Sequence, residues 1–435
     1  MNSSKLITLI LLLLLQQIAS AQQSLTQLTE KYTPYLKELN QDITILTSTK
    51  GKTAVANIGK RNFNEHTVFN IGSATKKMTA ILILQEAEKG NLKLSDSIGT
   101  YLQAIQNVDN SLTIEALLRH RSGLGEIVGR NYTEEYFAKS DSAYNQNILN
   151  RIPAGNLEKV GKYQYCNTNY ILLGKILEKV ADKSYFDLLE ERIFQPANMQ
   201  ESYPYLSKSL NNLAPPTHRG KDVSKFLDHR FFSNYAYAAG SVASTLHDMQ
   251  LFYNHLFEKK TLLSENSLKL LTSFDDANYG LGMIQFKDGY IGHGGNNLGY
   301  AYREYYNPQE KKLILCFSNG EIIPFNKILK KELFDYINGK PSTISFSKNI
   351  TSQFKGALGK YQFDTHGMKM QMEIIEKNNH IYFLTQGAQV ILVSKEENKL
   401  YNGSFGIELE VNPQKNDELI FRQNGLETTI KRINP

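Results

Sequence analysis

Polar and apolar residues alternate near the start of the chain, over residues 42–57, on both sides of Lys50-Gly51. A period of two that is broken by a turn pair predicts a β-hairpin. The pattern returns at residues 281–293, where two alternating runs flank Lys287-Asp288-Gly289, a strong hairpin signal. Further strand patterns follow within residues 300–317. These two groups of strands, far apart in the sequence, are expected to form one antiparallel sheet.

Helical spacing of apolar residues dominates the segment between the strand groups, residues 92–271. A helix is also expected after Ser73. Its middle, residues 78–84, is apolar on nearly every face, which is typical of a helix inside a large core. Gly90 is placed to end that helix, and Thr113 to cap a short one farther on. The predicted fold class is α+β: an antiparallel sheet flanked by helices, with a mostly helical insertion.

The last part of the chain has a different pattern. After a composition shift at residues 341–349, residues 368–374 again alternate with a period of two, and Asn424-Gly425 marks a turn. Short alternating strands separated by turns predict an all-β barrel or sandwich. We therefore expect a main domain at residues 22–340, a linker at 341–349 and a C-terminal β domain at 350–435. The β domain has no acid–base cluster, so we expect it to be a support or binding module.

The first 21 residues have the pattern of a secretory signal peptide. Lys5 precedes an apolar run at residues 6–15, and Ala19-Ser20-Ala21 supplies the small residues that precede cleavage. The run is about half as long as a membrane-spanning helix, which needs roughly 20 apolar residues. We therefore expect a mature chain from Gln22 onward, periplasmic or secreted, with no membrane span after cleavage.

Composition narrows the possible functions. Hydrophobic residues make up 41% and charged residues 21% of the 435-residue chain, as in ordinary globular proteins. The net charge is +6 and the basic residues are scattered, which argues against nucleic-acid binding. The nine histidines are dispersed without a His-Glu-x-x-His motif, so we expect no metal and no cofactor. Cys166 and Cys316 are too few for a disulfide framework, and we expect free, buried thiols.

Ser73-Ala74-Thr75-Lys76 is the first candidate for chemistry. On a helix, positions i and i+3 share a face, with Cβ atoms about 5–6 Å apart, so the lysine amine can reach the serine oxygen. Serine needs such a base to act as a nucleophile. The pattern recurs at residues 345–348 and 352–355, and an N-cap serine with a solvated lysine is its commonest meaning. Only Ser73 follows a strand-like run and opens a buried helix.

Two further motifs carry polar chemistry. In Tyr165-Cys166-Asn167, a tyrosine beside an ammonium can act as general base and then as general acid, and Asn167 offers an amide that can position a substrate. Tyr336-Ile337-Asn338 repeats this motif, and an isolated tyrosine is usually part of a core. In His293-Gly294-Gly295, the glycines allow the backbone of a substrate to approach closely. A strand-end histidine bonded to a neighbour is the simpler alternative.

These three motifs, in this order, resemble the serine β-lactamase and penicillin-binding-protein superfamily, particularly its class C-like, D-aminopeptidase and esterase branch. Three longer stretches share the resemblance: FNIGS at residues 69–73, LLRHRSGL at 117–124 and AGSVAST at 239–245. Each piece is common, but their ordered combination is specific.

The resemblance implies a role for each matched position. Ser73 would be the acyl-accepting nucleophile, and Lys76 with Tyr165 would handle the protons. The backbone N–H groups of Ser73 and Asn296 would form the oxyanion hole. The substrate would contact four further residues: Asn167, His293, Gly294 and Gly295.

Two departures affect the expected substrate. Gly294 lacks the hydroxyl that in many relatives helps to hold a substrate carboxylate, and His293 replaces a lysine and is mostly neutral at pH 7. Both favour an esterase or D-amino-acid peptidase over a dedicated β-lactamase. The prediction is an exported serine hydrolase that forms an acyl-enzyme on Ser73 and cleaves an ester, D-amino-acid peptide or β-lactam amide bond. Its partner would be a small molecule or peptide, with peptidoglycan fragments among the candidates. The alternative is a catalytically silent protein that binds cell-wall peptide or another partner.

Overall fold

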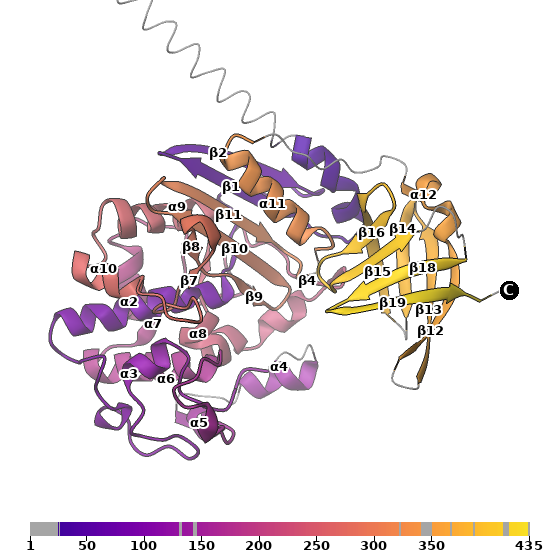
Figure 1. Cartoon of the computed structure of the whole chain (residues 1–435). Coiled ribbons are helices and arrows are strands. Elements are labelled where there is room, and N and C mark those ends of the chain that lie inside the picture. The colour runs from indigo at the N-terminus through magenta and orange to yellow at the C-terminus, as the bar shows by residue number, and fades with distance from the viewer. Residues whose placement is uncertain are drawn as a thin grey trace, which may run out of the picture. The chain divides into compact units, whose positions relative to one another are not determined.

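The computed structural model describes residues 25, 27–129, 133–141, 146–321, 323–340, 350–365, 368–385, 388–411 and 417–433. They form two compact units (Figure 1). One is mainly Asn40–Glu321, and the other combines Glu30–Leu39 with the residues that follow Glu321. The signal peptide expected at residues 1–21 and the linker expected at residues 341–349 lie outside the described residues. The limits expected for the two domains therefore stay predictions.

An antiparallel sheet lies at the centre of the first unit, in the order β2-β1-β11-β10-β8-β7, with β9 also paired to β10. Its strands are β1 (Ile43–Thr49), β2 (Lys52–Ile58), β7 (Ile284–Gln285), β8 (Ile291–Gly292), β9 (Gly295–Asn297), β10 (Tyr300–Asn307) and β11 (Lys312–Ser318). The first predicted hairpin is confirmed, because β1 and β2 pair through a turn in which Lys50 and Gly51 have φ angles of 49° and 81°. β1 also pairs with β11, so the two groups of strands meet in one sheet, as expected.

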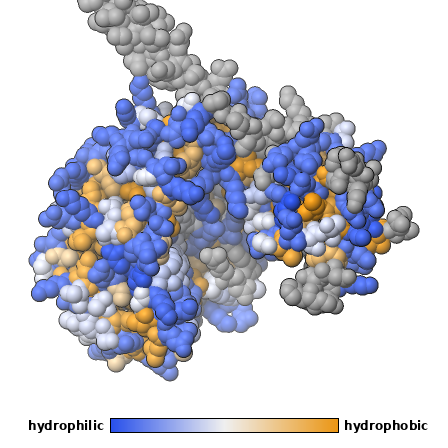
Figure 2. Space-filling model, in the orientation of Figure 1, coloured by the Kyte–Doolittle hydropathy of each residue, from blue (hydrophilic) through white to orange (hydrophobic). Residues whose placement is uncertain are grey.

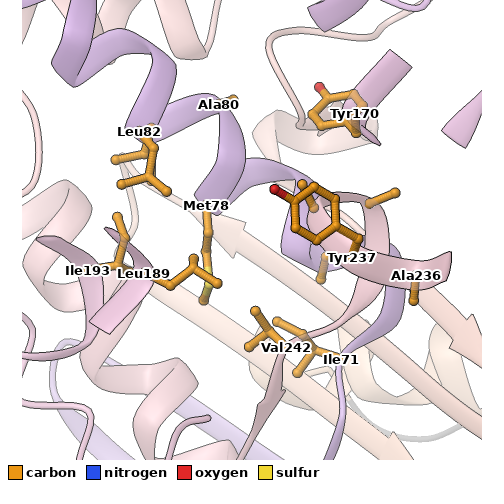
Figure 3. Close-up of a cluster of buried hydrophobic side chains, with 14 of the residues drawn as sticks. Ile71, Met78, Ala80, Leu82, Tyr170, Leu189, Ile193, Ala236, Tyr237 and Val242 are labelled. Atoms are coloured by element: carbon orange, nitrogen blue, oxygen red, sulfur yellow. The ribbon is translucent and has the colours of Figure 1, made fainter. Parts of the chain in front are cut away.

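Helix α2 (Thr75–Glu88) is the buried helix that the sequence predicts. Every residue from Thr75 to Leu84 is buried. Figure 3 shows Met78 and Leu82 of this helix facing Leu189 and Ile193 within the core of the unit. Gly90 ends the helix with a φ of 79°, as expected. The helix therefore fixes the position of its own first turn through packing on all sides.

Strands β7 and β8 are shorter than the sequence pattern predicts. Each has two residues, although the turn between them has the expected left-handed residues, Asp288 and Gly289. The chain before β7 passes close to the first turn of α2, where a Cβ atom on Gly282 would lie 2.8 Å from the Lys76 carbonyl oxygen. The alternating pattern continues there, but the backbone packs on a helix instead of pairing with a strand.

Short helices and irregular chain alternate through residues 92–271, so this region is less helical than predicted. Its α-helices are α3 (Ile114–Leu118), α4 (Glu134–Asp141), α5 (Gln146–Leu149), α6 (Asn167–Ala181), α7 (Tyr185–Leu189), α8 (Tyr237–Gly240), α9 (Leu246–Tyr253) and α10 (Glu265–Leu271), and π-helical turns continue α7 and α9. The region also contributes to small sheets, β3 (Phe69–Asn70) with β6 (Ala243–Ser244) and β4 (Thr217–His218) with β5 (Lys221–Asp222). Thr113 caps α3 as expected, because its Oγ1 accepts from the Ala116 N–H at 3.1 Å.

Side-chain hydrogen bonds hold some of the irregular segments in place. The Asn70 amide donates to the carbonyl oxygens of Gly240, Ser241 and Val242 at 2.9–3.0 Å. Backbone groups that a helix would satisfy internally are satisfied here by a distant side chain. The segment at residues 240–242 is thereby held without being part of a longer helix.

A closed antiparallel barrel makes up most of the second unit. Its strands, in sequence order, are β12 (Gly359–Thr365), β13 (Met368–Lys377), β14 (His380–Thr385), β15 (Ala388–Glu396), β16 (Lys399–Asn402), β17 (Ile407–Val411), β18 (Glu418–Gln423) and β19 (Leu426–Arg432). The unit also contains α11 (Asn326–Ile337) and α12 (Ile350–Gln353). Pairing of β12 with β19 closes the sheet, so the predicted β domain is a barrel and not a sandwich.

The surface is ordinary for a globular protein. Figure 2 shows mostly hydrophilic residues on the visible face, with apolar residues in scattered groups. Within the described ranges, no helix combines the length and the apolar character needed to cross a membrane.

Candidate active site

Ser73 lies in a tight turn, Gly72–Ala74, that leads directly into α2. Strand β9 passes this turn with almost no space between the two backbones. A Cβ atom on Gly295 would lie 2.0 Å from the Ile71 carbonyl oxygen and 2.7 Å from the Ser73 nitrogen. Only glycine fits at position 295, so its role here is close approach of two protein segments. That approach places the turn of Ser73 beside Asn296.

Lys76 is fully buried on the first turn of α2, and its ammonium is aimed at the serine. The Lys76 Nζ lies 3.0 Å from the Ser73 Oγ, 2.7 Å from the Asn167 Oδ1 and 2.8 Å from the Ala239 carbonyl oxygen. It also lies 4.9 Å from the centre of the Tyr165 ring. The hydroxyl, the amine and the tyrosine of the predicted set therefore meet at one place.

Asn167 is held in one orientation by a residue that sequence reasoning missed, Glu126. The Glu126 Oε2 accepts hydrogen bonds from the Asn167 backbone N–H at 2.8 Å and from its side-chain Nδ2 at 3.0 Å. The amide oxygen of Asn167 is thereby turned toward Lys76. The Glu126 carboxylate also lies beside Asn167, the first residue of α6. A negative charge is favoured at this end of a helix. The position of Glu126, three residues after Gly123 in an irregular segment, gave no signal in the sequence.

His293 belongs to a chain of hydrogen bonds that leads away from the cavity. The Cys166 backbone N–H donates to the His120 Nδ1, so the Nε2 of that neutral ring carries the proton and donates to the Tyr279 hydroxyl, 3.1 Å away. The Tyr279 hydroxyl donates to the His293 Nε2 at 3.1 Å, and the His293 Nδ1 donates to the Gly294 carbonyl oxygen at 2.6 Å. One consistent direction of donation links both histidines.

Both histidines in this chain are neutral at pH 7. Burial, reinforced by the nearby Lys76 ammonium, lowers the pKa of His293 to about 3 and holds the pKa of His120 well below its usual value. His293 therefore supplies no positive charge to the site at pH 7.

A buried ion pair between Lys77 and Glu304 stabilises the segment that carries His293. The Lys77 Nζ lies 2.5 and 2.7 Å from the two carboxylate oxygens of Glu304, and both side chains are fully buried. Glu304 also accepts from the His293 backbone N–H at 2.9 Å and from the Tyr302 hydroxyl at 2.9 Å. Neither partner was singled out from the sequence, because Lys77 and Glu304 lie 227 residues apart.

A cavity of about 370 Å³ opens onto these groups. Every predicted site residue except the buried Lys76 lines it: Ser73, Tyr165, Asn167, His293, Gly294, Gly295 and Asn296. The wall also includes Arg303, which the sequence analysis did not select. Across the described ranges, no group of three or more histidine, cysteine or acidic residues could hold a metal ion.

The repeated motifs lie elsewhere in the structure. Ser352 is in α12, and Tyr336 is in α11, so both belong to the second unit. The match at residues 345–348 lies outside the described residues. Cys166 and Cys316 are free and buried, as expected.

Comparison with known proteins agrees with this arrangement. A family model described as Beta-lactamase matches residues 40–332, about two thirds of the chain. The chain belongs to the β-lactamase family. The resemblance to the serine β-lactamase and penicillin-binding-protein superfamily is thereby confirmed.

Individual relatives of this β-lactamase family member are distant. PbpX of Bacillus subtilis (strain 168), a protein named for penicillin binding, is 26% identical over 310 residues, which cover 67% of this chain and 73% of PbpX. Teichoic acid D-alanine hydrolase of Staphylococcus aureus (strain MRSA252) is 25% identical over 217 residues, 49% of this chain and about half, 52%, of that protein. The structure of an octameric penicillin-binding protein homologue from Pyrococcus abyssi has a TM-score of 0.61 at 21% identity, covering 94% of this chain and 99% of that one. This last likeness shows the fold.

Proposed function

We propose that the chain is an exported serine hydrolase that works through an acyl-enzyme on Ser73. The observation that carries this proposal is the 3.0 Å distance between the Lys76 Nζ and the Ser73 Oγ at the wall of an open cavity. A lysine within hydrogen-bond reach of a serine is the arrangement that activates the hydroxyl as a nucleophile.

In this proposal, the Ser73 proton passes to the Lys76–Tyr165 pair as the Ser73 Oγ attacks the substrate carbonyl carbon. The carbonyl oxygen becomes an oxyanion, which the backbone N–H groups of Ser73 and Asn296 stabilise. Removing one such donor typically costs about 3–4 kcal/mol of transition-state stabilisation. The bond to the leaving group then breaks, and the pair returns the proton to that group. Water attacks the acyl-serine in the same way and releases the acid.

Tyr165 is assigned to this step because of its position. The Lys76 ammonium lies against its ring, and the ring also packs 4.3 Å from the ring of His120. Asn167 is assigned two tasks. Its amide oxygen accepts a hydrogen bond from Lys76, and its amide nitrogen, which donates one hydrogen to Glu126, is assigned to substrate contact. His293, Gly294 and Gly295 are assigned to the substrate-facing strand.

The proposed substrates are esters and D-amino-acid amides or peptides, including fragments of the cell wall. The Staphylococcus aureus relative is named as a hydrolase of D-alanine on teichoic acid, which is an acyl-transfer reaction of this kind. A periplasmic or secreted location fits such substrates and the predicted signal peptide, and both remain part of the proposal.

Labelling with a fluorophosphonate probe tests the proposal. We expect one adduct per chain on Ser73, located by peptide mass spectrometry, and hydrolysis of p-nitrophenyl esters that falls at least about 10³-fold in Ser73→Ala. Ser352→Ala is the matched control, because it removes the serine of a second Ser-x-x-Lys motif in the other unit, and it should leave labelling and hydrolysis unchanged. Undiminished hydrolysis by Ser73→Ala would refute the acyl-enzyme. Cell-wall peptide binding without any turnover would favour the silent alternative.

A further inference from the structure

A second cavity, of about 530 Å³, lies in the first unit apart from the catalytic one. Its volume is within the range of small-molecule sites, about 300–1,000 Å³. The two cavities meet at α8, because Tyr237 lines the second cavity, whereas Ala239 and Gly240 line the first. No residue lines both, and the proposed hydrolysis uses none of the residues that line the second. The second cavity is therefore a separate place for a ligand.

Aromatic rings form an accessible part of the wall of this second cavity. Tyr205 is 40% exposed, and its ring centre lies 5.1 Å from that of the half-buried Phe186. Phe186 packs in turn against Tyr237, with 5.7 Å between ring centres and an angle of 78° between the planes. Only six large hydrophobic side chains among the described residues are exposed, so an exposed tyrosine on a cavity wall is unusual in this molecule. Its ring is open to a ligand and is supported by packing behind it.

Short neutral polar side chains also line the second cavity, and they keep hydrogen-bonding capacity. The Asn234 Nδ2 donates to the Ser140 carbonyl oxygen at 2.8 Å, which leaves its second N–H for a ligand. A serine hydroxyl has one donor and two acceptor positions. Ser184, Ser207 and Ser233 each keep at least one of these positions beyond their bonds to neighbouring residues.

The charged side chains of the wall balance one another. Lys175 and Arg230 are positive and Glu178 and Asp228 are negative, so their formal charges cancel. The Lys175 Nζ lies 2.8 Å from the Glu178 Oε2, and Asp228 is paired with a lysine outside the wall. His229 contacts two carboxylates that also lie outside the wall. The cavity is therefore suited to a ligand without a net charge.

We propose that the second cavity binds a neutral oligosaccharide. A sugar ring combines an apolar face of C–H groups with a rim of hydroxyl groups. The C–H groups pack on the negative face of an aromatic ring, and the hydroxyl groups bond to short hydroxyl and amide side chains. In this site the sugar packs on Tyr205 beside Phe186, and its hydroxyl groups bond to Ser207, Ser233 and Asn234. Binding here needs no acyl-enzyme, so the inference goes beyond the proposed function and does not depend on it.

Calorimetric titration with two tetrasaccharides, one of N-acetylglucosamine and one of glucose, tests this inference. We expect saturable binding of at least one of them, with the same affinity in the wild type and in Ser73→Ala. Tyr205→Ala should lower that affinity at least about 10-fold, because it removes the ring on which the sugar packs. Tyr205→Phe keeps the ring and should retain the binding. Leu270→Ala is the matched control, because it truncates a similarly exposed side chain, on α10, that does not line the cavity.

Three outcomes would overturn the inference and leave the proposed hydrolase untouched. The first is no binding of either tetrasaccharide by the wild type at concentrations up to about 10 mM. The second is equal affinity in the wild type and Tyr205→Ala, which would place the sugar elsewhere on the protein. The third is binding of inorganic phosphate or choline, lost in Tyr205→Ala, without binding of the tetrasaccharides, which would show that the cavity takes an ion. Thermal unfolding of Tyr205→Ala should match the wild type, so that a loss of binding is not a loss of fold.

Discussion

Two buried lysines occupy consecutive positions on α2, and they do different work. Lys76 and Lys77 are both fully buried, and their ammonium groups contact different residues. Lys77 donates to both carboxylate oxygens of Glu304, whereas Lys76 donates to the neutral oxygens of Ser73, Asn167 and Ala239. The Lys77 charge is therefore neutralised by a carboxylate and contributes to stability, whereas the Lys76 charge lies beside the serine that we propose as the nucleophile.

The surroundings of the two lysines explain this difference. Burial lowers the pKa of Lys77 and the Glu304 carboxylate opposes that effect, so removing one partner would leave the other as a buried charge. The Lys76 ammonium lies beside the Ser73 Oγ and between the rings of Tyr165 and Tyr170, 4.9 and 5.5 Å from their centres. Lys77 should therefore dominate stability, and Lys76 should dominate activity.

Lys76→Met is expected to have the largest effect on activity. Loss of the base at the serine should lower kcat for ester hydrolysis by about 10³-fold or more, within or above the range of general base catalysis. The melting temperature should change less than in Lys77→Met, because Lys77→Met leaves the Glu304 carboxylate buried without its cation. Steady-state kinetics and thermal unfolding, measured for both variants in parallel, test these expectations for activity and melting temperature. Equal loss of activity and stability in Lys76→Met would break the comparison.

Lys77→Met is expected to have the largest effect on stability. It leaves the buried Glu304 carboxylate without its cation, which should lower the free energy of unfolding by about 3–5 kcal/mol. Urea unfolding followed by fluorescence measures this change. Lys77→Met/Glu304→Gln is the matched control. Its amide oxygen can still accept the His293 N–H without carrying a charge, so part of the stability should return. A double variant less stable than Lys77→Met would contradict the assignment.

The sequence predicts one of these lysines and not the other, for a physical reason. Lys76 is recognisable because its distance from Ser73 is set by the helix itself, three residues along one face. The partner of Lys77 is 227 residues away, and the fold alone brings it there. Glu126 escaped notice in the same way, since it acts on Asn167 from a segment 41 residues away.

The fold divides along a similar line. Local signals predicted the hairpin at Lys50-Gly51, the cap at Thr113 and the end of α2 at Gly90, all of which are confirmed. Whether the last strands close into a barrel depends on the pairing of β12 with β19, which no local pattern contains. Within residues 92–271, the irregular backbone at 240–242 is held by the Asn70 amide, a contact from another segment that no local pattern contains.

Acid pH should lower the free energy of unfolding, because the two buried histidines near Lys76 are neutral in the folded chain. The folded-state pKa values of His120 and His293 are lowered, so the unfolded chain binds protons below pH 6.5 that the folded chain does not. Stability is therefore fully present above pH 6.5 and is lost as pH falls toward about 3, the folded pKa of His293. Each histidine contributes a slope of about 1.4 kcal/mol per pH unit at most. His66 and His229 shift the opposite way, because their rings bond to carboxylates, so they offset part of this slope.

Urea unfolding at pH 7, 6 and 5 measures this slope, in a range above the ordinary pKa of most carboxylates. His120→Gln, which keeps a side-chain N–H donor without titrating, should have a shallower slope than the wild type. A stability that rises between pH 6.5 and 5 would show that these histidines are charged in the folded state.

Tyr279→Phe is expected to have the smallest effect. It tests how far the site around Lys76 depends on the hydrogen bonds that join His120, Tyr279 and His293. The variant removes one hydroxyl that joins His120 to His293 and leaves two buried ring nitrogens without a partner. The free energy of unfolding should fall by about 1–3 kcal/mol. Because the His293 ring then loses one of the two hydrogen bonds that orient it, kcat should fall about 10-fold with little change in KM, the result of a misplaced strand and not of a lost substrate contact. Tyr290→Phe, which removes the hydroxyl of another buried tyrosine just before β8, is the matched control. A KM effect that exceeds the kcat effect would place Tyr279 among the groups that touch the substrate.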